Sequence, residues 1–129
     1  MGVPSVGVKK EGKKPVWENG YVSLSHTEKY IVSVFSHAPV GVDMEKCKRR
    51  NFAALSRRFC GETLDESAFY RRWTAAESRF KADGTPVTES LKTECEKQGR
   101  FYTFNNHLIC FIGEGKILWN EEARKLRIV

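Results

Sequence analysis

The chain has 129 residues and a formal net charge of +6, from 22 Lys and Arg against 16 Asp and Glu. Hydrophobic residues make up 40% and aromatic residues 12%, which excludes wholesale disorder. The length suits one domain rather than two. No apolar run reaches 18 residues, and the first residues lack the apolar block of a secretory signal. We therefore expect a cytoplasmic protein with no membrane span.

The four cysteines also favour the cytoplasm. They are Cys47, Cys60, Cys95 and Cys110, and no two of them form a CxxC pair. A zinc site is therefore not expected. Without an export signal, four reduced thiols are the expected state.

The N-terminal half of the sequence predicts an arm followed by strands. Residues 1–14 are polar and basic and are predicted to be an N-terminal arm, ahead of a domain over 15–129. From Tyr21, apolar residues alternate with serines, which is the period of a strand. Residues 30–35 are rich in β-branched residues and predict a partner strand, and residues 40–45 predict a third. Together the three strands predict an antiparallel meander.

The remaining chain predicts two helices and further strands. The helices are expected over residues 52–60 and 65–82, and Asp83-Gly84 provides a C-terminal stop for the second. Residues with helical spacing are expected to form the buried stripe of that second helix: Phe69, Trp73, Ala76 and Phe80. Strand-like stretches follow at residues 101–104, 108–112 and 116–119, and the last ten residues are ambiguous. The predicted class is α+β, with an antiparallel sheet packed against one long and one shorter helix.

Two carboxylates lie on the third predicted strand. Asp43 and Glu45 are two residues apart, so their side chains share one face, while Val42 and Met44 point the other way into a core. Neighbouring carboxylates repel each other, so they are favourable only in water or around a cation. A hard ion such as Mg²⁺ takes oxygen ligands and keeps several waters. A solvated strand face is the alternative.

A third acidic residue lies on the long predicted helix. Trp73, Glu77 and Lys81 are spaced four apart and therefore lie along one side of that helix. A plain surface ion pair between Glu77 and Lys81 is the alternative explanation. The tryptophan indicates that the stripe meets the sheet, which would place Glu77 at the margin of a packed region.

Polar groups that could bind an anion lie at the end of the first strand. Ser25, His26 and Thr27 provide hydroxyls, backbone N–H groups and an imidazole there. A surface or structural histidine is the alternative for His26, and it is the assignment for His37 and His107. Motifs for a serine hydrolase, a Walker loop or a dinucleotide site are absent from the sequence.

These segments, in this order, resemble the 4′-phosphopantetheinyl transferases of the Sfp type. That family has the patterns Gly-Lys-Pro, Leu-Ser-His-Ser, Gly-Val-Asp-Ile-Glu and Trp-Thr-x-Lys-Glu-Ala-x-x-Lys. The corresponding segments here, between Lys13 and Gly84, are Lys14-Pro15, Leu24-Ser-His-Thr27, Gly41-Val-Asp-Met-Glu45 and Trp73-Thr-Ala-Ala-Glu-Ser-Arg-Phe-Lys81.

The resemblance implies a reaction and a set of roles. Mg²⁺ would be held by Asp43, Glu45 and Glu77 at the pyrophosphate of coenzyme A. A serine of an acyl or peptidyl carrier protein would attack the β-phosphate, and adenosine 3′,5′-bisphosphate would leave. Glu77 would also act as the base, and Lys81 would neutralise a phosphate oxygen. The coenzyme-contacting residues would be Lys14, Ser25, His26 and Lys81.

The sequence departs from the family pattern in three ways. Lys13 replaces a glycine, and Ala76 replaces the lysine before the catalytic glutamate, so one cation near the coenzyme is missing. Sfp-type enzymes consist of two similar halves, and most of the first half has no counterpart before Lys13. We therefore expect a homo-oligomer, a dimer or trimer that completes the site between subunits, as the short holo-acyl-carrier-protein synthases do.

Basic residues surround these motifs and fit an acidic partner. They are Lys46, Lys48, Arg49, Arg50, Arg57, Arg58, Arg71 and Arg72. Such a cluster would speed the encounter with an acidic carrier protein, and a solvated basic face is the alternative. Two other functions stay open: a non-catalytic homologue that binds coenzyme A or a carrier, and a nucleic-acid-binding domain. No recognition motif supports the last of these, so we expect no nucleic acid.

Overall fold

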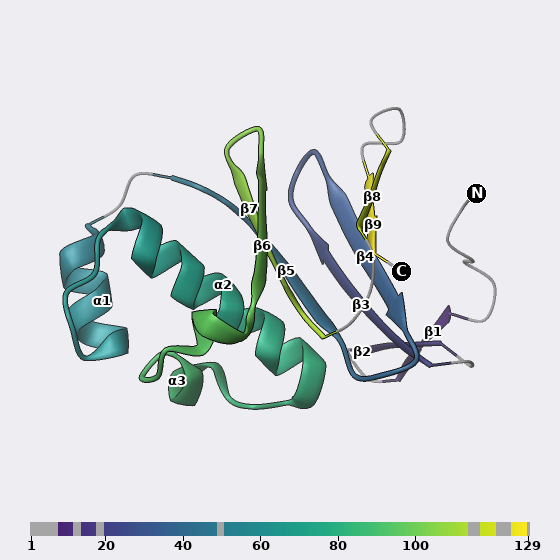
Figure 1. Cartoon of the computed structure of the whole chain (residues 1–129), viewed down its shortest axis with the longest axis horizontal. Coiled ribbons are helices and arrows are strands. Elements are labelled where there is room, and N and C mark those ends of the chain that lie inside the picture. Colours follow the sequence, from purple (N-terminus) through teal and green to yellow (C-terminus); the bar gives the residue numbers. More distant parts are fainter. Residues whose placement is uncertain are drawn as a thin grey trace.

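The computed structural model describes the backbone of residues 8–11, 14–17, 20–48, 51–113, 117–120 and 125–128, and the side chains of 20–48 and 51–113 (Figure 1). The strands are β1 Val8–Glu11, β2 Lys14–Trp17, β3 Tyr21–His26, β4 Ile31–Ser36, β5 Gly41–Lys46, β6 Arg100–Phe104, β7 His107–Ile112, β8 Ile117–Asn120 and β9 Lys125–Ile128. The helices are α1 Phe52–Cys60, α2 Glu66–Asp83 and α3 Val87–Ser90, with a 3₁₀ turn at Cys95–Gln98.

Two sheets and a helical layer are stacked side by side (Figure 1). The middle layer is a three-stranded antiparallel sheet with the order β5-β7-β6. The helices cover one of its faces, with α2 along β5 and β7, and the second sheet, of order β3-β4-β9-β8, covers the other. The predicted α+β class, with a sheet packed against a long and a shorter helix, is confirmed.

The predicted antiparallel meander is only half right. β3 and β4 form the expected antiparallel hairpin, with Val22 opposite Phe35. β5, however, pairs with β7 and lies in the other sheet. The reason lies in the apolar side of β5: Val42 and Met44 pack face to face against Val32 of β4, and a strand beside β4 in the same sheet would not bury them in this way.

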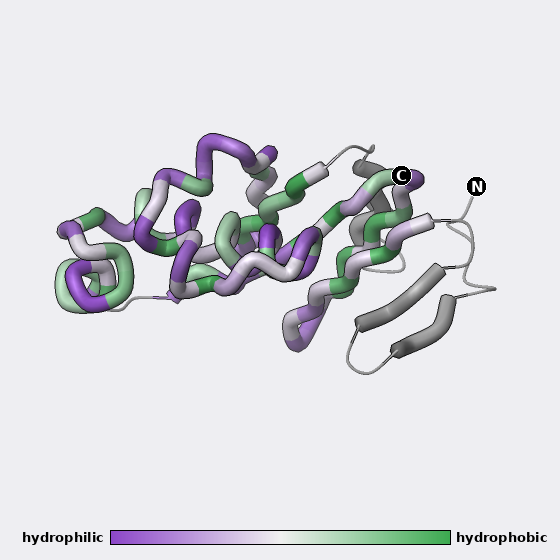
Figure 2. Tube along the Cα trace, turned by 90° about the horizontal axis from the view of Figure 1, so that it is seen from below, coloured by the Kyte–Doolittle hydropathy of each residue, from purple (hydrophilic) through white to green (hydrophobic). Residues whose placement is uncertain are grey.

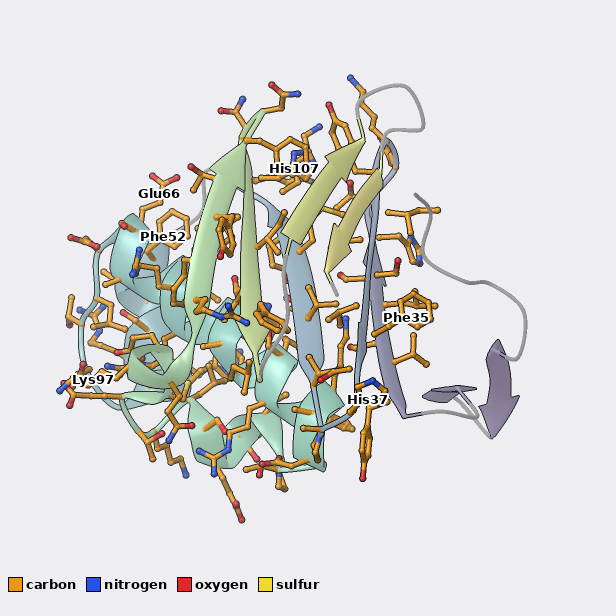
Figure 3. All side chains as sticks on the ribbon, turned by 45° about the vertical axis from the view of Figure 1, so that its right-hand side comes forward. Phe35, His37, Phe52, Glu66, Lys97 and His107 are labelled. Atoms are coloured by element: carbon orange, nitrogen blue, oxygen red, sulfur yellow. The ribbon has the colours of Figure 1, made fainter. Side chains whose placement is uncertain are left out.

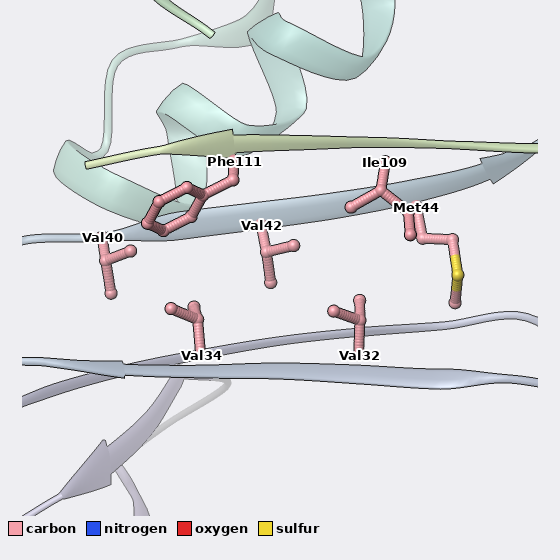
Figure 4. Packing of buried hydrophobic residues seen from close by; sticks show 7 residues of the cluster. All are labelled: Val32, Val34, Val40, Val42, Met44, Ile109 and Phe111. Atoms are coloured by element: carbon pink, nitrogen blue, oxygen red, sulfur yellow. The ribbon is translucent and has the colours of Figure 1, made fainter. Parts of the chain in front are cut away.

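The core between the two sheets is apolar. Figure 4 shows side chains from β4, β5 and β7 meeting between the layers. The cluster consists of Val32, Val34, Val40, Val42, Met44, Ile109 and Phe111, each no more than 2% exposed. Figure 2 shows the contrast with the hydrophilic turn between β3 and β4. This core fixes the register of β5 and therefore which of its side chains face α2.

Helix α2, Glu66–Asp83, matches the helix predicted over 65–82 within one residue at each end. The Asp65 side chain accepts a hydrogen bond from the Ala68 amide at the N-terminus, and Gly84 ends the helix in the left-handed conformation, with φ of 80°. Phe69 and Ala76 are buried as expected, in a second cluster between the helices and the middle sheet. The predicted burial of Phe80 is wrong, since it is 46% exposed.

A glycine lets α2 approach the sheet and explains the exposure of Phe80. A Cβ atom on Gly41 would collide with the backbone carbonyl of Ser78. The second half of α2 therefore lies against β5 through Ser78 and Ala82, which are both buried. Phe80 lies on a different side of the helix from these two residues. This close approach brings the C-terminal half of α2 next to the acidic residues of β5.

The segments near the ends of the sequence contain strands. β1 and β2, which lie largely within the predicted arm, pair with each other in an antiparallel register that places Val8 opposite Trp17. The boundary between arm and domain stays a prediction. β8 matches the strand predicted at 116–119 within one residue, and β9, in the ambiguous final segment, lies parallel to β4. Within the described ranges, no helix is both long and apolar enough to cross a membrane.

Candidate functional site: buried carboxylates between β5 and α2

Strand β5 presents its acidic residues to α2, as its alternation predicts. Asp43 and Glu45 lie on the helix side, while Val42 and Met44 are buried in the core between the sheets. Asp43 is only 6% exposed. The alternative of a solvated strand face is therefore wrong, because both faces of β5 are covered.

Lys81 of α2 holds the Asp43 carboxylate. Its ammonium group donates to Asp43 Oδ1 at 3.3 Å and to the backbone carbonyl of Leu24 in β3 at 3.1 Å. The alternative of a surface pair between Lys81 and Glu77 is wrong: in the described part of the chain, the ion-pair partner of Lys81 is Asp43. Burial raises the pKa of Asp43, and the charge of Lys81 opposes this increase.

One oxygen of this carboxylate has no partner. Asp43 Oδ2 is buried and makes no hydrogen bond in the structure. Leaving a carboxylate oxygen buried without a donor is costly, so its presence needs an explanation. An unmet buried acceptor of this kind is what a bound cation would satisfy.

Trp73 orients the second carboxylate. Its indole Nε1–H donates to Glu45 Oε1 at 2.7 Å. Burial raises the pKa of Glu45 to about 7, and the negative charges of Asp43 and Glu77 add to this increase. Near neutral pH this carboxyl group therefore binds a proton readily, or a cation in its place.

Glu77 is the third member of the group. It lies half-buried on α2, one turn before Lys81. Its pKa is raised, first by burial and then by the charge of Asp43. The structure thus brings Asp43, Glu45, Glu77 and Lys81 into one electrostatic group, in which the charge of Asp43 makes the ionisation of Glu45 and of Glu77 more costly.

The chemistry of this group fits a hard divalent cation. Three carboxyl groups whose pKa values burial raises, one with an unsatisfied buried oxygen, match the oxygen ligands that Mg²⁺ takes. Among the residues that the structure describes, however, no three acidic, histidine or cysteine side chains are already arranged to hold a metal ion. Magnesium binding therefore stays a proposal.

The residues expected to contact the coenzyme lie in different settings. Ser25 is buried, and its Oγ accepts from the Met44 amide at 2.9 Å and lies 3.5 Å from Asp43 Oδ1. His26 is exposed and follows Ser25 on the strand, so its side chain points to the opposite face. The backbone of Lys14 lies in β2, and its side chain is outside the described residues. The structure thus joins Ser25 to the carboxylates but not His26.

One residue of the predicted basic face, Arg72, is buried. Arg72 is 5% exposed and forms ion pairs with Glu62 at 3.1 Å and Glu96 at 3.0 Å, so its assignment to a solvated surface is wrong. Burial without neutralisation would be costly, which explains why both acids meet it. Arg49 and Arg50 lie outside the described residues. The remaining members are exposed: Lys46, Lys48, Arg57, Arg58 and Arg71.

Sequence reasoning missed several residues around the site. It treated Trp73 only as a packing anchor, and it gave no role to Ser23, whose Oγ accepts from the Val42 amide at 3.1 Å. It also left His107 as an ordinary structural histidine, although His107 lines a pocket beside Glu45. The pairing of Ser23 with Ser25 at a two-residue spacing was the available signal, because both must share a face. No sequence signal connects His107 to β5.

Comparison with known proteins finds a distant similarity to a curated protein. The chain is similar to a 4′-phosphopantetheinyl transferase of Bacillus subtilis, with 25% identity over 113 residues, covering 76% of this chain. The chain spans about half the length of this curated relative. No family model matches the chain, and no solved structure matches it. The similarity supports the resemblance carried by the motifs on β3, β5 and α2.

Proposed function

We propose that this chain is a 4′-phosphopantetheinyl transferase that modifies a serine of an acyl or peptidyl carrier protein with the arm of coenzyme A. The observation that carries the proposal is the buried group of Asp43, Glu45, Glu77 and Lys81, which β5 and α2 bring together from two separate segments. The similarity to a curated transferase of that name supports the same function.

The residues of the group would divide the reaction between them. The carrier serine oxygen forms a bond to the β-phosphorus of coenzyme A while the bond from that phosphorus to the bridging oxygen breaks. Adenosine 3′,5′-bisphosphate leaves with the electron pair. Glu77 accepts the serine proton, and burial together with the charge of Asp43 raises its pKa, which strengthens it as a base. Lys81 supplies positive charge at the phosphate oxygens.

The metal ion would be held by the same carboxylates. Asp43, Glu45 and Glu77 would bind Mg²⁺, and the unsatisfied Oδ2 of Asp43 would provide one ligand. When bound, the ion would supply charge neutralisation at the pyrophosphate. Trp73 keeps one oxygen of Glu45 engaged and so restricts the orientation of that carboxylate.

The acceptor protein would approach from the side of α1. An apolar pocket of about 230 Å³ adjoins Glu45, and it is lined by Glu45, Lys46, Leu55, Phe59, Phe69, Tyr70 and Trp73. Exposed Lys46, Arg57 and Arg58 lie on the elements that form this pocket. An acidic carrier with an apolar side chain near its serine would fit both properties.

The decisive experiment is a transfer assay. The protein is mixed with coenzyme A, Mg²⁺ and a panel of apo carrier proteins, and mass spectrometry detects the added arm. The matched controls are each carrier with its acceptor serine changed to alanine, and pantetheine in place of coenzyme A. We expect addition to at least one carrier and in neither control. No addition to any carrier by folded protein would overturn the proposal.

A binding-only homologue is the second candidate. Ala76 favours it, because this residue, which replaces the lysine of the family pattern, is fully buried and brings no cation to the site. Calorimetry with coenzyme A separates the two functions. Binding of the coenzyme without transfer to any carrier would support the second candidate.

Self-association, as a dimer or trimer, stays part of the proposal. β6 is an outer strand of its sheet, and three large apolar side chains of β3 and β4 are exposed: Tyr21, Leu24 and Ile31. Exposed strand edges and apolar faces are typical of surfaces that pair with another copy. Light scattering after gel filtration is expected to give a multiple of the monomer mass, and a monomer at all concentrations would contradict it.

A further inference from the structure

A second pocket also adjoins Glu45, and the transfer reaction proposed above does not yet assign it a ligand. It has a volume of about 270 Å³ and is lined by Thr27, Glu28, Lys29, Glu45, Lys46, Lys48 and His107. These residues come from the β3–β4 turn, the end of β5 and the start of β7. Figure 3 shows His107 at this end of the molecule. The site is therefore built from three segments that are distant in sequence.

We infer that this pocket binds a phosphate group. Its lining includes the side chains of Lys29, Lys46 and Lys48, which are all exposed. None of the three ammonium groups has an ion-pair partner within the described ranges, so their charges are available to a ligand. Several ammonium groups and a hydroxyl around a small pocket are the groups that bind phosphate oxygens.

His107 forms the buried wall of the pocket. It is 4% exposed and packs against two aromatic rings: its ring centroid is 5.0 Å from that of Tyr30 and 5.5 Å from that of Phe104. Its Nδ1 lies 2.8 Å from the backbone carbonyl of Asn105. A carbonyl oxygen only accepts, so Nδ1 carries a hydrogen. The packing and this bond fix the ring.

The other ring nitrogen controls the Thr27 hydroxyl. His107 Nε2 and Thr27 Oγ1 are 3.1 Å apart. Because Nδ1 carries the ring hydrogen, Nε2 accepts from the Thr27 hydroxyl. This hydrogen bond holds the Thr27 side chain at the edge of the pocket, with its oxygen open to a hydrogen-bonding ligand.

The acidic residues of the lining limit what can bind. Glu28 and Glu45 reduce the positive potential, so a weakly charged anion such as chloride gains little from the pocket. A phosphate group carries more charge and several acceptor oxygens, and it can contact the lysines and the hydroxyl together. The volume also leaves room for water beside a phosphate group. The phosphate can be free, or it can belong to a larger ligand such as coenzyme A.

The test is a titration of the whole chain with inorganic phosphate, without magnesium and at constant ionic strength set by chloride. NMR signals of the Thr27 amide and the His107 ring report binding. We expect saturable shifts in both, and roughly tenfold weaker binding when Lys46 and Lys48 are both changed to alanine. Lys92→Ala is the matched control, because Lys92 is exposed and outside the pocket. It should leave binding unchanged.

Substitutions at Thr27 test the role of the hydroxyl. Thr27→Ser keeps the hydroxyl and should retain binding, whereas Thr27→Val keeps the shape and should weaken binding severalfold. Absence of saturable shifts, or equal affinity in the double lysine variant and Lys92→Ala, would overturn the inference.

Competition then identifies the source of the phosphate. Displacement of inorganic phosphate by coenzyme A, but not by pantetheine, assigns the site to a phosphate of the coenzyme. A site that coenzyme A leaves unaffected is one for a separate phosphate ligand, and the inference stands in both cases. None of these measurements uses carrier modification, so failure of the proposed transferase activity would remain distinguishable from failure of the phosphate site.

Discussion

The two faces of the middle sheet are both buried, but they are built from opposite chemistry. On the side of β4, Val42 and Met44 join a core that is entirely apolar. On the side of α2, Asp43 and Glu45 of the same strand are covered by a helix that brings Lys81 and Trp73 to them. A strand of only six residues thus contributes to a dry core and to an acidic site at once.

Burial therefore has two separate consequences on the two faces of this strand. The apolar face stabilises the fold, at roughly 25 cal/mol for each Å² of apolar surface removed from water. The acidic face is unfavourable for the fold without a cation, as the raised pKa values of Asp43, Glu45 and Glu77 indicate. Such a concentration of raised pKa values in one place is typical of a functional site. Substitutions on the two faces should therefore have opposite consequences.

The largest expected effect is on the acidic face. Glu77→Gln should lower the rate of carrier modification at least about a hundredfold, because an amide cannot accept the serine proton. Stability should not fall, since a neutral side chain replaces a carboxyl group whose pKa is already raised. The initial rate by mass spectrometry and thermal unfolding measure the two quantities. Glu89→Gln, at an exposed position on α3, is the control, and a wild-type rate in Glu77→Gln would contradict the assigned role.

On the apolar face, Met44→Ala should reverse this pattern. Met44 is 2% exposed, and its truncation should lower the free energy of unfolding by about 2–4 kcal/mol. The proposed transfer rate of the folded protein should change much less than in Glu77→Gln. Urea unfolding followed by circular dichroism gives the stability. A loss of stability below about 1 kcal/mol would show that the core between the sheets tolerates a cavity there.

Substitutions of Ser23 and Ser25, whose hydroxyls join β3 to β5, should have an intermediate effect on stability. Ser23→Ala leaves the Val42 amide without its acceptor and should destabilise the protein by about 1–2 kcal/mol. Ser25→Ala removes the acceptor of the Met44 amide and also the hydroxyl beside Asp43, so it should lower the transfer rate as well. Comparing the two variants by unfolding and by rate separates the structural role from the functional one. Equal transfer rates would mean that both serines only hold β3 against β5.

The smallest effect concerns pH. The pKa of Glu45 is about 7 in the fold against an ordinary 4.5, so the folded state binds this proton more tightly than the unfolded state. Its stabilising contribution is full below pH 4.5 and is lost as the pH rises through 7. Glu45→Gln should therefore raise stability at pH 8, on the order of 1 kcal/mol, and leave it unchanged at pH 4.5.

Unfolding curves at the two pH values, with and without Mg²⁺, check this expectation. Mg²⁺ should stabilise the wild type more at pH 8 than at low pH, because it competes with protons for the same carboxylates. The variant should respond less to the ion. Equal stabilisation of both proteins at every pH would contradict a role for Glu45 in binding the metal.

Much of the secondary structure could be read from local patterns. The N-cap at Asp65 and the glycine stop at Gly84 define α2, and alternation predicts that Asp43 and Glu45 share a face. The pairing of β5 with β7 could not be predicted, because strand pairing depends on which apolar faces meet after folding. Arg72 was assigned to the surface for a related reason: its two acidic partners lie 10 and 24 residues away.

Local patterns in the chain are enough to predict most of the helices and strands, the shared face of the carboxylates and the resemblance to a transferase family. The packed fold is needed to see that this face is buried, that Lys81 pairs with Asp43 rather than Glu77, and that His107 lies beside Glu45. These features differ in the distance along the chain over which the interactions act. Side-chain periodicity and helix caps act between neighbours in the chain, whereas burial and charge pairing depend on segments that only the packing of α2 and the two sheets brings together.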